Sequence, residues 1–304
     1  MKKTILILVV ALTLLACKNK AKQDNGKLNV VTTTTMITDL VKNIGGDLVN
    51  IQGLMGSGVD PHLYKASEGD VTKLVNADII FYNGLHLEGK LVEVFEKMGS
   101  KTKTPIALAE EIDKSTLIGS DYFASNYDPH VWFNIEYFKQ FTKKVTSVLS
   151  EKNPENASRF SENEKVFLDK LETLQQNVLS TIETLAKEKR ILVTAHDAFN
   201  YFGKNYSFNV VGLQGLSTAT EAGVQDVQKL AAFIIENKVK AIFVESSVPK
   251  RTIEALQAAV KSKGHDVVIG GTLYSDALGN TGTLEGTYVG MFEYNVNTIV
   301  KALK

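Results

Sequence analysis

Short apolar runs alternate with amphipathic stretches along most of the chain. The first set of strand-like runs reads LNVVTTTT (28–35), LVNIQGLM (48–55), ADIIFYNG (77–84) and TPIALA (104–109). Apolar residues recur at helical spacing between these runs, most clearly over 36–44, 67–76 and 88–98. Strands that alternate with helices of about ten residues indicate βαβ units and a mostly parallel sheet.

The same alternation returns in the last third of the chain. Strand-like runs cover residues 190–196, 208–214, 239–246 and 266–271, and helical patterns cover 224–237, 249–263 and 287–303. Two sets of four strands predict an α/β fold with two lobes, each built on a mostly parallel four-stranded sheet flanked by helices. We place the N-terminal lobe at residues 28–153 and the C-terminal lobe at 190–304.

The segment between the lobes, residues 154–189, contains no glycine and no proline after Pro154. Its apolar residues fall three, four or seven positions apart: Phe160, Phe167, Leu171, Leu174, Val178, Ile182 and Leu185. That spacing predicts one long amphipathic helix, which would run roughly 50 Å. A single helix implies a stiffer connection between the lobes than extended crossovers would give.

The first residues form a separate unit. Lys2 and Lys3 precede an apolar stretch, 4–15, that is too short for a stop-transfer helix. Leu14-Leu15-Ala16-Cys17 follows, and it resembles the lipobox of bacterial lipoproteins. We therefore expect a lipoprotein signal peptide over 1–17, lipidation at Cys17 and a polar tether over 18–27. The alternative is an ordinary signal peptide followed by a stray cysteine.

Composition and net charge restrict the kinds of binding partner that we expect. Hydrophobic content of 44% and charged content of 22% are typical of a soluble globular body. The formal net charge is zero, which gives no reason to expect binding to nucleic acid or to an anionic membrane surface. With the predicted anchor, the sequence indicates an exported protein that is lipid-anchored to the membrane and faces the periplasm or the cell exterior.

Asp-Pro-His occurs twice, at 60–62 and 128–130, in a chain with only five histidines. Proline fixes its own backbone and keeps the preceding residue extended, so each tripeptide presents its histidine, His62 or His130, from a stiff turn. His196 ends a predicted strand, and Asp276 follows the last one. Ligands of open α/β sheets bind outside the carboxyl ends of strands. Three imidazoles and one carboxylate suit a divalent transition metal, with zinc the easiest fit.

Each of these residues also has a simpler interpretation. A single histidine is often a capping or surface residue, and Asp276 alone is explained as a turn residue. We expect His86 to begin a helix with Glu88 as its first-turn carboxylate, and His265 to lie at the surface at the opposite end of the sheet. The Val131–Phe133 aromatic stretch is expected to pack between the lobes.

Several motifs, in order along the chain, closely resemble the zinc- and manganese-binding lipoproteins of bacterial ABC importers, and TroA-like members most of all. They are GVDPHLYKASEGDVTKLVNADIIFYNGLHLE, DPHVWF, LVTAHDAFNYF, GLQGLSTATEAG, AIFVESSVP and GGTLYSDALG. The resemblance covers the chain from about Leu28. It implies two lobes joined by one long helix, with a metal bound between them by His62, His130, His196 and Asp276. It also implies a membrane permease as partner, and we expect a monomer.

The resemblance bears on the choice of metal. Family members dedicated to manganese tend to carry glutamate at the third ligand position, where this chain has His196, and a third imidazole favours zinc. No histidine-rich loop precedes His130, which is similar to the TroA-like subgroup, for which both metals are reported. We therefore favour zinc as the bound metal, with manganese as the alternative.

Carboxylates near the four residues could orient their imidazoles, or could serve only as caps and turns: Asp60, Asp128, Asp197 and Glu245. Two other functions compete with metal transport. An exported metal-dependent hydrolase would need an open coordination position and a general base, but the chain has no His-Glu-x-x-His, Gly-x-Ser-x-Gly or glycine-rich phosphate loop. We therefore expect no enzyme. A surface adhesin with a structural metal would unfold on chelation.

Overall fold

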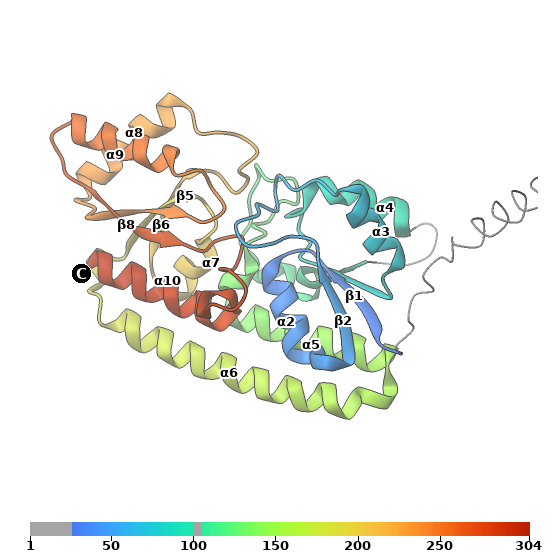
Figure 1. Ribbon diagram of the computed structural model, residues 1–304. Helices are drawn as coiled ribbons and strands as arrows, with labels where there is room; N and C mark the ends of the chain where they lie inside the picture. The colour runs from blue at the N-terminus through green and yellow to red at the C-terminus, as the bar shows by residue number, and fades with distance from the viewer. Residues whose placement is uncertain (1–25, 100–104) are drawn as a thin grey trace, which may run out of the picture.

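The computed structural model describes residues 26–99 and 105–304 (Figure 1). The predicted signal peptide, Cys17 and most of the predicted tether lie outside the described residues, so these expectations stay predictions. Among the residues that are described, no helix combines the length and the apolarity that crossing a bilayer would require.

The first sheet has four parallel strands in the order β2-β1-β3-β4. They are β1 (Leu28–Thr32), β2 (Val49–Gly53), β3 (Ile79–Tyr82) and β4 (Ile106–Ala107). Each is shorter than the apolar run that predicted it, and β4 keeps only two residues. The last residues of those runs follow the strands and lie at the carboxyl edge of the sheet.

The second sheet repeats this arrangement, with parallel strands in the order β6-β5-β7-β8. Its members are β5 (Ile191–His196), β6 (Asn209–Gln214), β7 (Ala241–Glu245) and β8 (Val268–Leu273). Strand β8 starts two residues later than the predicted run. The central strands β5 and β7 are almost wholly buried, as expected for strands covered on both faces. The predicted fold of two similar α/β lobes is confirmed.

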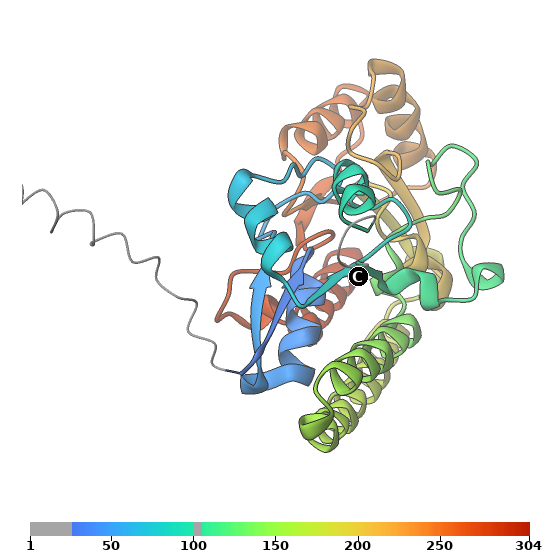
Figure 2. The ribbon, with the colours of Figure 1, turned by 90° about the vertical axis from the view of Figure 1, so that its right-hand side faces the viewer.

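Helices flank both sheets (Figures 1 and 2). In chain order they are α2 (Thr35–Gly45), α3 (Glu68–Asn76), α4 (Val92–Gly99), α5 (Ile135–Lys152), α6 (Ala157–Glu183), α7 (Asn200–Tyr206), α8 (Val224–Glu236), α9 (Arg251–Ser262) and α10 (Tyr288–Leu303). Side chains that cap the first turn explain where several of these helices begin. Thr34 caps α2, Ser67 and Asp70 form a capping box on α3, and Thr287 caps α10.

Helix α6 joins the lobes and runs beneath both of them (Figure 1). It has 27 residues, or about 40 Å at 1.5 Å per residue. The predicted span was longer, but its two ends form separate 3-10 turns at Pro154–Asn156 and Lys187–Lys189. The apolar stripe from Phe160 to Ile182 is buried as predicted.

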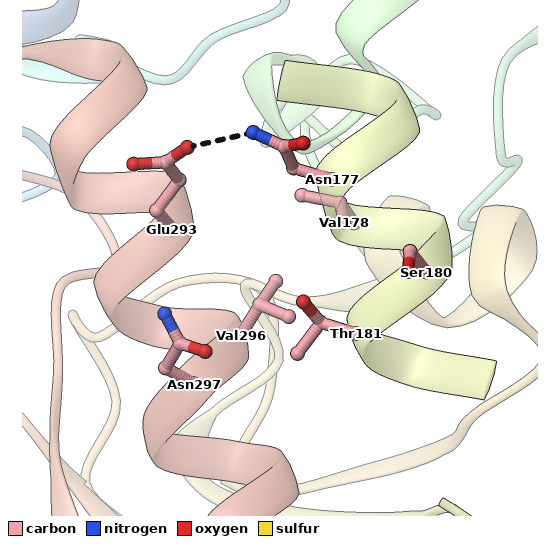
Figure 3. Close-up of a pocket in the computed structure, with 7 residues that line it drawn as sticks. All are labelled: Asn177, Val178, Ser180, Thr181, Glu293, Val296 and Asn297. Atoms are coloured by element: carbon pink, nitrogen blue, oxygen red, sulfur yellow. Dashed lines mark hydrogen bonds between the residues drawn. The ribbon is translucent and has the colours of Figure 1, made fainter. Parts of the chain in front are cut away.

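On its exposed side, α6 meets α10 along a shallow polar hollow of about 340 Å³ (Figure 3). Asn177 of α6 donates a hydrogen bond to Glu293 of α10 across it, at 3.4 Å. Val178 and Val296 form its floor and are almost fully buried. The hollow therefore reflects the packing of two helices, away from the strand ends.

One hydrophobic core continues across the boundary between the lobes. The Phe133 and Phe199 rings lie 4.4 Å apart, and Phe133 also contacts Phe292 of α10 at 6.0 Å. Trp132 Nε1 donates a hydrogen bond of 3.0 Å to the carbonyl oxygen of Ser275. The aromatic stretch after His130 thus packs between the lobes, as predicted from the sequence.

Candidate metal centre

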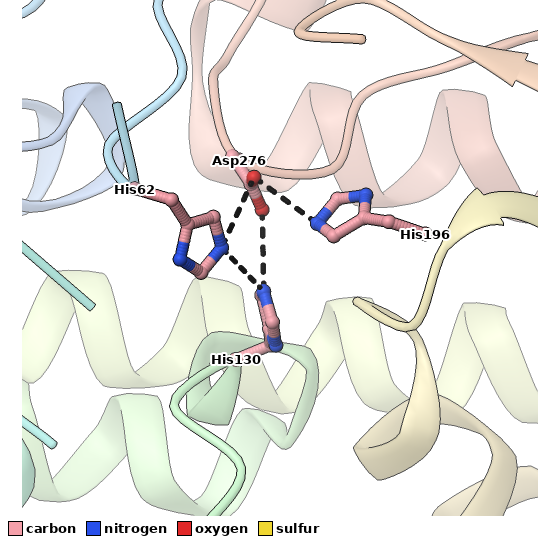
Figure 4. A group of neighbouring side chains, drawn as sticks. All are labelled: His62, His130, His196 and Asp276. Atoms are coloured by element: carbon pink, nitrogen blue, oxygen red, sulfur yellow. Dashed lines mark hydrogen bonds and ion pairs between the residues drawn. The ribbon is translucent and has the colours of Figure 1, made fainter. Parts of the chain in front are cut away.

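The structure brings the four predicted ligands together between the lobes (Figure 4). His62 lies in the loop after β2, and His130 precedes a 3-10 turn that leads into α5. His196 is the last residue of β5, and Asp276 lies in the loop after β8. One ligand atom from each residue falls within 4.8 Å of the others, and all four side chains are buried.

The spacing of these atoms suits a small cation. The Nε2 atoms of His62 and His130 are 3.2 Å apart. His62 Nε2 lies 3.7 Å and His196 Nε2 3.2 Å from Asp276 Oδ2, while His130 Nε2 lies 3.6 Å from Asp276 Oδ1. A tetrahedral zinc ion bound at about 2.0–2.1 Å would separate its ligand atoms by about 3.4 Å. The four groups are therefore already spaced for such an ion.

Three ligand atoms at the centre lack the partners that buried polar atoms normally have. His196 Nε2 and both carboxylate oxygens of Asp276 are buried, and apart from their approach to one another and to the other two imidazoles they have no partner. Over 90% of buried polar groups are satisfied in folded proteins, and exceptions call for an explanation. A divalent cation at the centre of the cluster would satisfy all three atoms at once.

Two buried carboxylates hold the far nitrogens of the imidazoles. Asp128 Oδ1 lies 2.7 Å from His130 Nδ1, and Glu245 Oε2 lies 2.6 Å from His196 Nδ1. Each contact leaves Nε2 pointing at the centre, since the tautomer of a ligating histidine is set by the partner of its other nitrogen. Asp128 and Glu245 thus take the orienting role that the sequence offered to four carboxylates.

The other two candidate carboxylates accept hydrogen bonds from backbone N–H groups and do not contact an imidazole nitrogen. Asp60 Oδ1 accepts a hydrogen bond of 2.8 Å from the backbone N–H of His62. Asp197 Oδ1 accepts one of 2.6 Å from the N–H of Gly212. Both carboxylates shape the loops that carry the ligands, which is the turn-forming interpretation given above.

The pKa values of the residues in the cluster depend on burial and on the charges of their neighbours. Burial lowers the pKa of His62 to about 3, although Asp276 opposes the shift. Burial also disfavours a charge on His196, but the carboxylates of Glu245 and Asp276 outweigh it and raise its pKa. Burial would raise the pKa of Asp276, yet the three imidazoles hold it well below its usual range. In the metal-free protein burial therefore favours the neutral, ligating form of His62, whereas the two carboxylates favour the protonated form of His196, whose extra proton would have to leave when a metal binds.

Sequence reasoning missed the role of Glu88. It is buried, and it accepts hydrogen bonds from Thr33 and from the backbone N–H groups of Asn83 and Gly84, so it is not an exposed first-turn carboxylate. Glu88 ties together the carboxyl ends of β1 and β3, as Glu245 does for β5 and β7. The only signal in the sequence is that Glu88 follows Leu85 and Leu87 and precedes Leu91.

The two remaining histidines stay outside the cluster. His86 is exposed and has a left-handed backbone with φ of 63°, so it lies in a turn before the helix and does not begin it. His265 lies between α9 and β8, remote from the carboxyl ends of the strands, and it is half-buried.

A family model described as ZnuA, zinc-uptake complex component A periplasmic, matches residues 30–302. The chain belongs to the ZnuA family. Among its relatives in the ZnuA family, the manganese-binding lipoprotein MntA of Bacillus subtilis (strain 168) is 46% identical over 99% of this chain and 97% of its own length. The zinc-binding protein TroA of Treponema pallidum (strain Nichols) is 48% identical over 92% of this chain and 90% of its own length.

The solved structure of the periplasmic zinc binding protein TroA from Treponema pallidum superimposes on this chain with a TM-score of 0.89. That match covers 91% of this chain and 99% of the TroA chain, at 48% identity. The ZnuA-family fold therefore extends over both lobes and the helix that joins them.

Proposed function

We propose that this chain captures a divalent transition metal between its lobes and delivers it to the membrane permease of an ABC importer. His62, His130, His196 and Asp276 would bind one ion per chain as cargo. The observation that carries the proposal is the cluster itself: four buried ligand atoms from both lobes lie within 4.8 Å of one another, and neither His196 Nε2 nor either oxygen of Asp276 has a partner outside the cluster.

Zinc is the favoured cargo, with manganese as the second possibility. Three imidazole nitrogens and one carboxylate are a ligand set typical of zinc, and zinc stands well above manganese in affinity for such a site. The relatives named above support both metals, since one is named for manganese and the other for zinc. Competitive titration with the two ions distinguishes zinc from manganese as the cargo.

The burial of the cluster favours carriage over catalysis. The exposed fraction is 5% for His62 and 0–1% for His130, His196 and Asp276, so an ester or peptide substrate has no approach to an ion held there. An adhesin with a structural metal would unfold without it, whereas a carrier stays folded when empty. The proposal further includes export, a lipid anchor at Cys17 and a monomeric body.

The proposal is tested by competitive titration of the purified, metal-stripped body (residues 18–304) with zinc and manganese. We expect one tight zinc per chain. His62→Ala and His196→Ala should each weaken zinc binding well over tenfold without unfolding either lobe, because each removes one of four ligands. His86→Ala is the matched control and should bind as the wild type does. Unchanged affinity in both ligand variants would show that the site is assigned wrongly.

A further inference from the structure

The two Asp-Pro-His tripeptides share an arrangement that metal ligation alone does not require. In each, one oxygen of the aspartate accepts a hydrogen bond from the backbone N–H of the histidine two residues later, at 2.8 Å for Asp60 and 2.9 Å for Asp128. The other oxygen accepts a hydrogen bond from a side chain of the C-terminal lobe. Thr218 Oγ1 donates to Asp60 Oδ2 at 2.5 Å, and Asn200 Nδ2 donates to Asp128 Oδ2 at 3.0 Å. Each aspartate therefore links a metal-binding loop to the opposite lobe.

The two links differ in their surroundings. Asp128 is fully buried, and its backbone carbonyl also accepts a hydrogen bond of 3.0 Å from the hydroxyl of buried Tyr201. The aromatic core around Phe133 and Phe199 lies next to it. This link belongs to the permanent contact between the lobes.

The link from Thr218 to Asp60 instead joins two surface loops. Residues 56–58 on one side and 219–221 on the other are exposed. Thr218 itself is 8% exposed and Asp60 is half-buried, and the hydrogen bond connects their two polar side chains. Among the contacts between the lobes described here, it is therefore well suited to open and close.

This link also lies on the side where the metal centre comes nearest to solvent. His62 is the most exposed of the four ligands, at 5%. The Phe123 ring contacts His62 edge-on at 6.4 Å between ring centres. Phe123 in turn lines an open hollow of about 480 Å³ whose other wall includes Gln214, Ser217 and Thr220, in the stretch that carries Thr218. The stretch that carries Thr218 thus borders a hollow that is linked to His62 through the Phe123 ring.

We propose that the Thr218–Asp60 hydrogen bond is a clasp that closes the lobes over the metal and sets how slowly the metal leaves. The proposal rests on the proposed function. Metal binding by residues of both lobes draws the two loops together, and the clasp then stabilises the closed form. Once the two loops part, water replaces both partners. The clasp therefore slows release more than it affects capture, which is governed by encounter.

The test compares rates of metal release and capture in variants of one loop with those of a control on α6. Thr218→Val keeps the shape of the side chain and removes its hydroxyl. Thr218→Ser keeps the hydroxyl, and Thr173→Val makes the same change at an exposed position on α6, away from the hollow. Zinc release is followed by stopped-flow with excess chelator, zinc capture with the metal-free protein, and folding by thermal unfolding of each metal-free variant. Thr218→Ala, which adds no bulk, replaces Thr218→Val if that variant does not fold.

We expect release from Thr218→Val to be about tenfold faster or more, as for loss of a hydrogen bond to a charged group. Capture should change little, and Thr218→Ser and Thr173→Val should behave as the wild type does. Release at the wild-type rate would overturn the clasp, and so would equal changes in release and capture. A wild-type chain that binds no metal would instead refute the proposed function, so the two failures are distinguishable.

Discussion

Replacement of Glu245 by glutamine probes how the protein prepares His196 for a metal. Glu245 ends β7, and its Oε1 accepts a hydrogen bond of 2.8 Å from the backbone N–H of His196. Its Oε2 lies 2.6 Å from His196 Nδ1, and both side chains are buried. A glutamine amide has one acceptor oxygen, so it can serve only one of these two groups. Its NH₂ then faces the other donor at close range, and the imidazole loses its fixed orientation.

The expected loss of zinc affinity is about 10- to 100-fold, the usual effect of removing the partner of a metal-ligating histidine, or about 1.4–2.8 kcal/mol. Proton competition makes this loss depend on pH. The Glu245 carboxylate helps to raise the pKa of His196, so the wild type must release a proton there when zinc binds. In Glu245→Gln that pKa falls, and less proton is displaced. The affinity difference between the two proteins should therefore grow from pH 6 to pH 8.

The assay is calorimetric titration with zinc at pH 6, 7 and 8, in two buffers of different ionisation enthalpy, which yields affinity and proton release together. Glu88→Gln is the matched control, because Glu88 is equally buried and spans the equivalent strand ends but contacts no imidazole. It should lower the free energy of unfolding and leave proton release at the wild-type value. Wild-type affinity and wild-type proton release in Glu245→Gln would refute the reasoning.

Two further predictions concern the metal-free protein. Since the pKa of His62 is lowered to about 3 in the folded state, only the unfolded chain takes up a proton there below its ordinary pKa of about 6.5. The free energy of unfolding should therefore fall as the pH drops from about 6.5 towards 3. Denaturant titrations at pH 7, 6 and 5 measure this fall. An equally steep fall in His62→Ala would contradict the prediction. Phe160→Ala removes a fully buried ring from α6 and should cost about 3–5 kcal/mol of stability, measured by urea unfolding, while zinc affinity should not change; weakened binding would mean that the linking helix also shapes the site.

Local patterns in the sequence were sufficient for the elements of this fold and for the choice of the four residues that cluster between the lobes. Apolar runs and helical spacing depend on near neighbours, so they located both four-stranded sheets to within a few residues. Proline stiffens the chain wherever it occurs, and strand ends face ligands in every open α/β sheet. His62, His130, His196 and Asp276 could therefore be selected before their distances were known, with the family resemblance turning separate candidates into one set.

Only the tertiary structure decided what the carboxylates do. Asp60, Asp128, Asp197 and Glu245 are equivalent on sequence, because each follows or ends a strand or begins a tripeptide near a ligand. Asp128 and Glu245 reach imidazoles, whereas Asp60 reaches Thr218, which is 158 residues away. Such a partner depends on how two loops meet when the lobes dock, and no local pattern encodes that meeting. The sequence therefore determined which groups could bind a metal, and the docking of the lobes determined how those groups are oriented and charged.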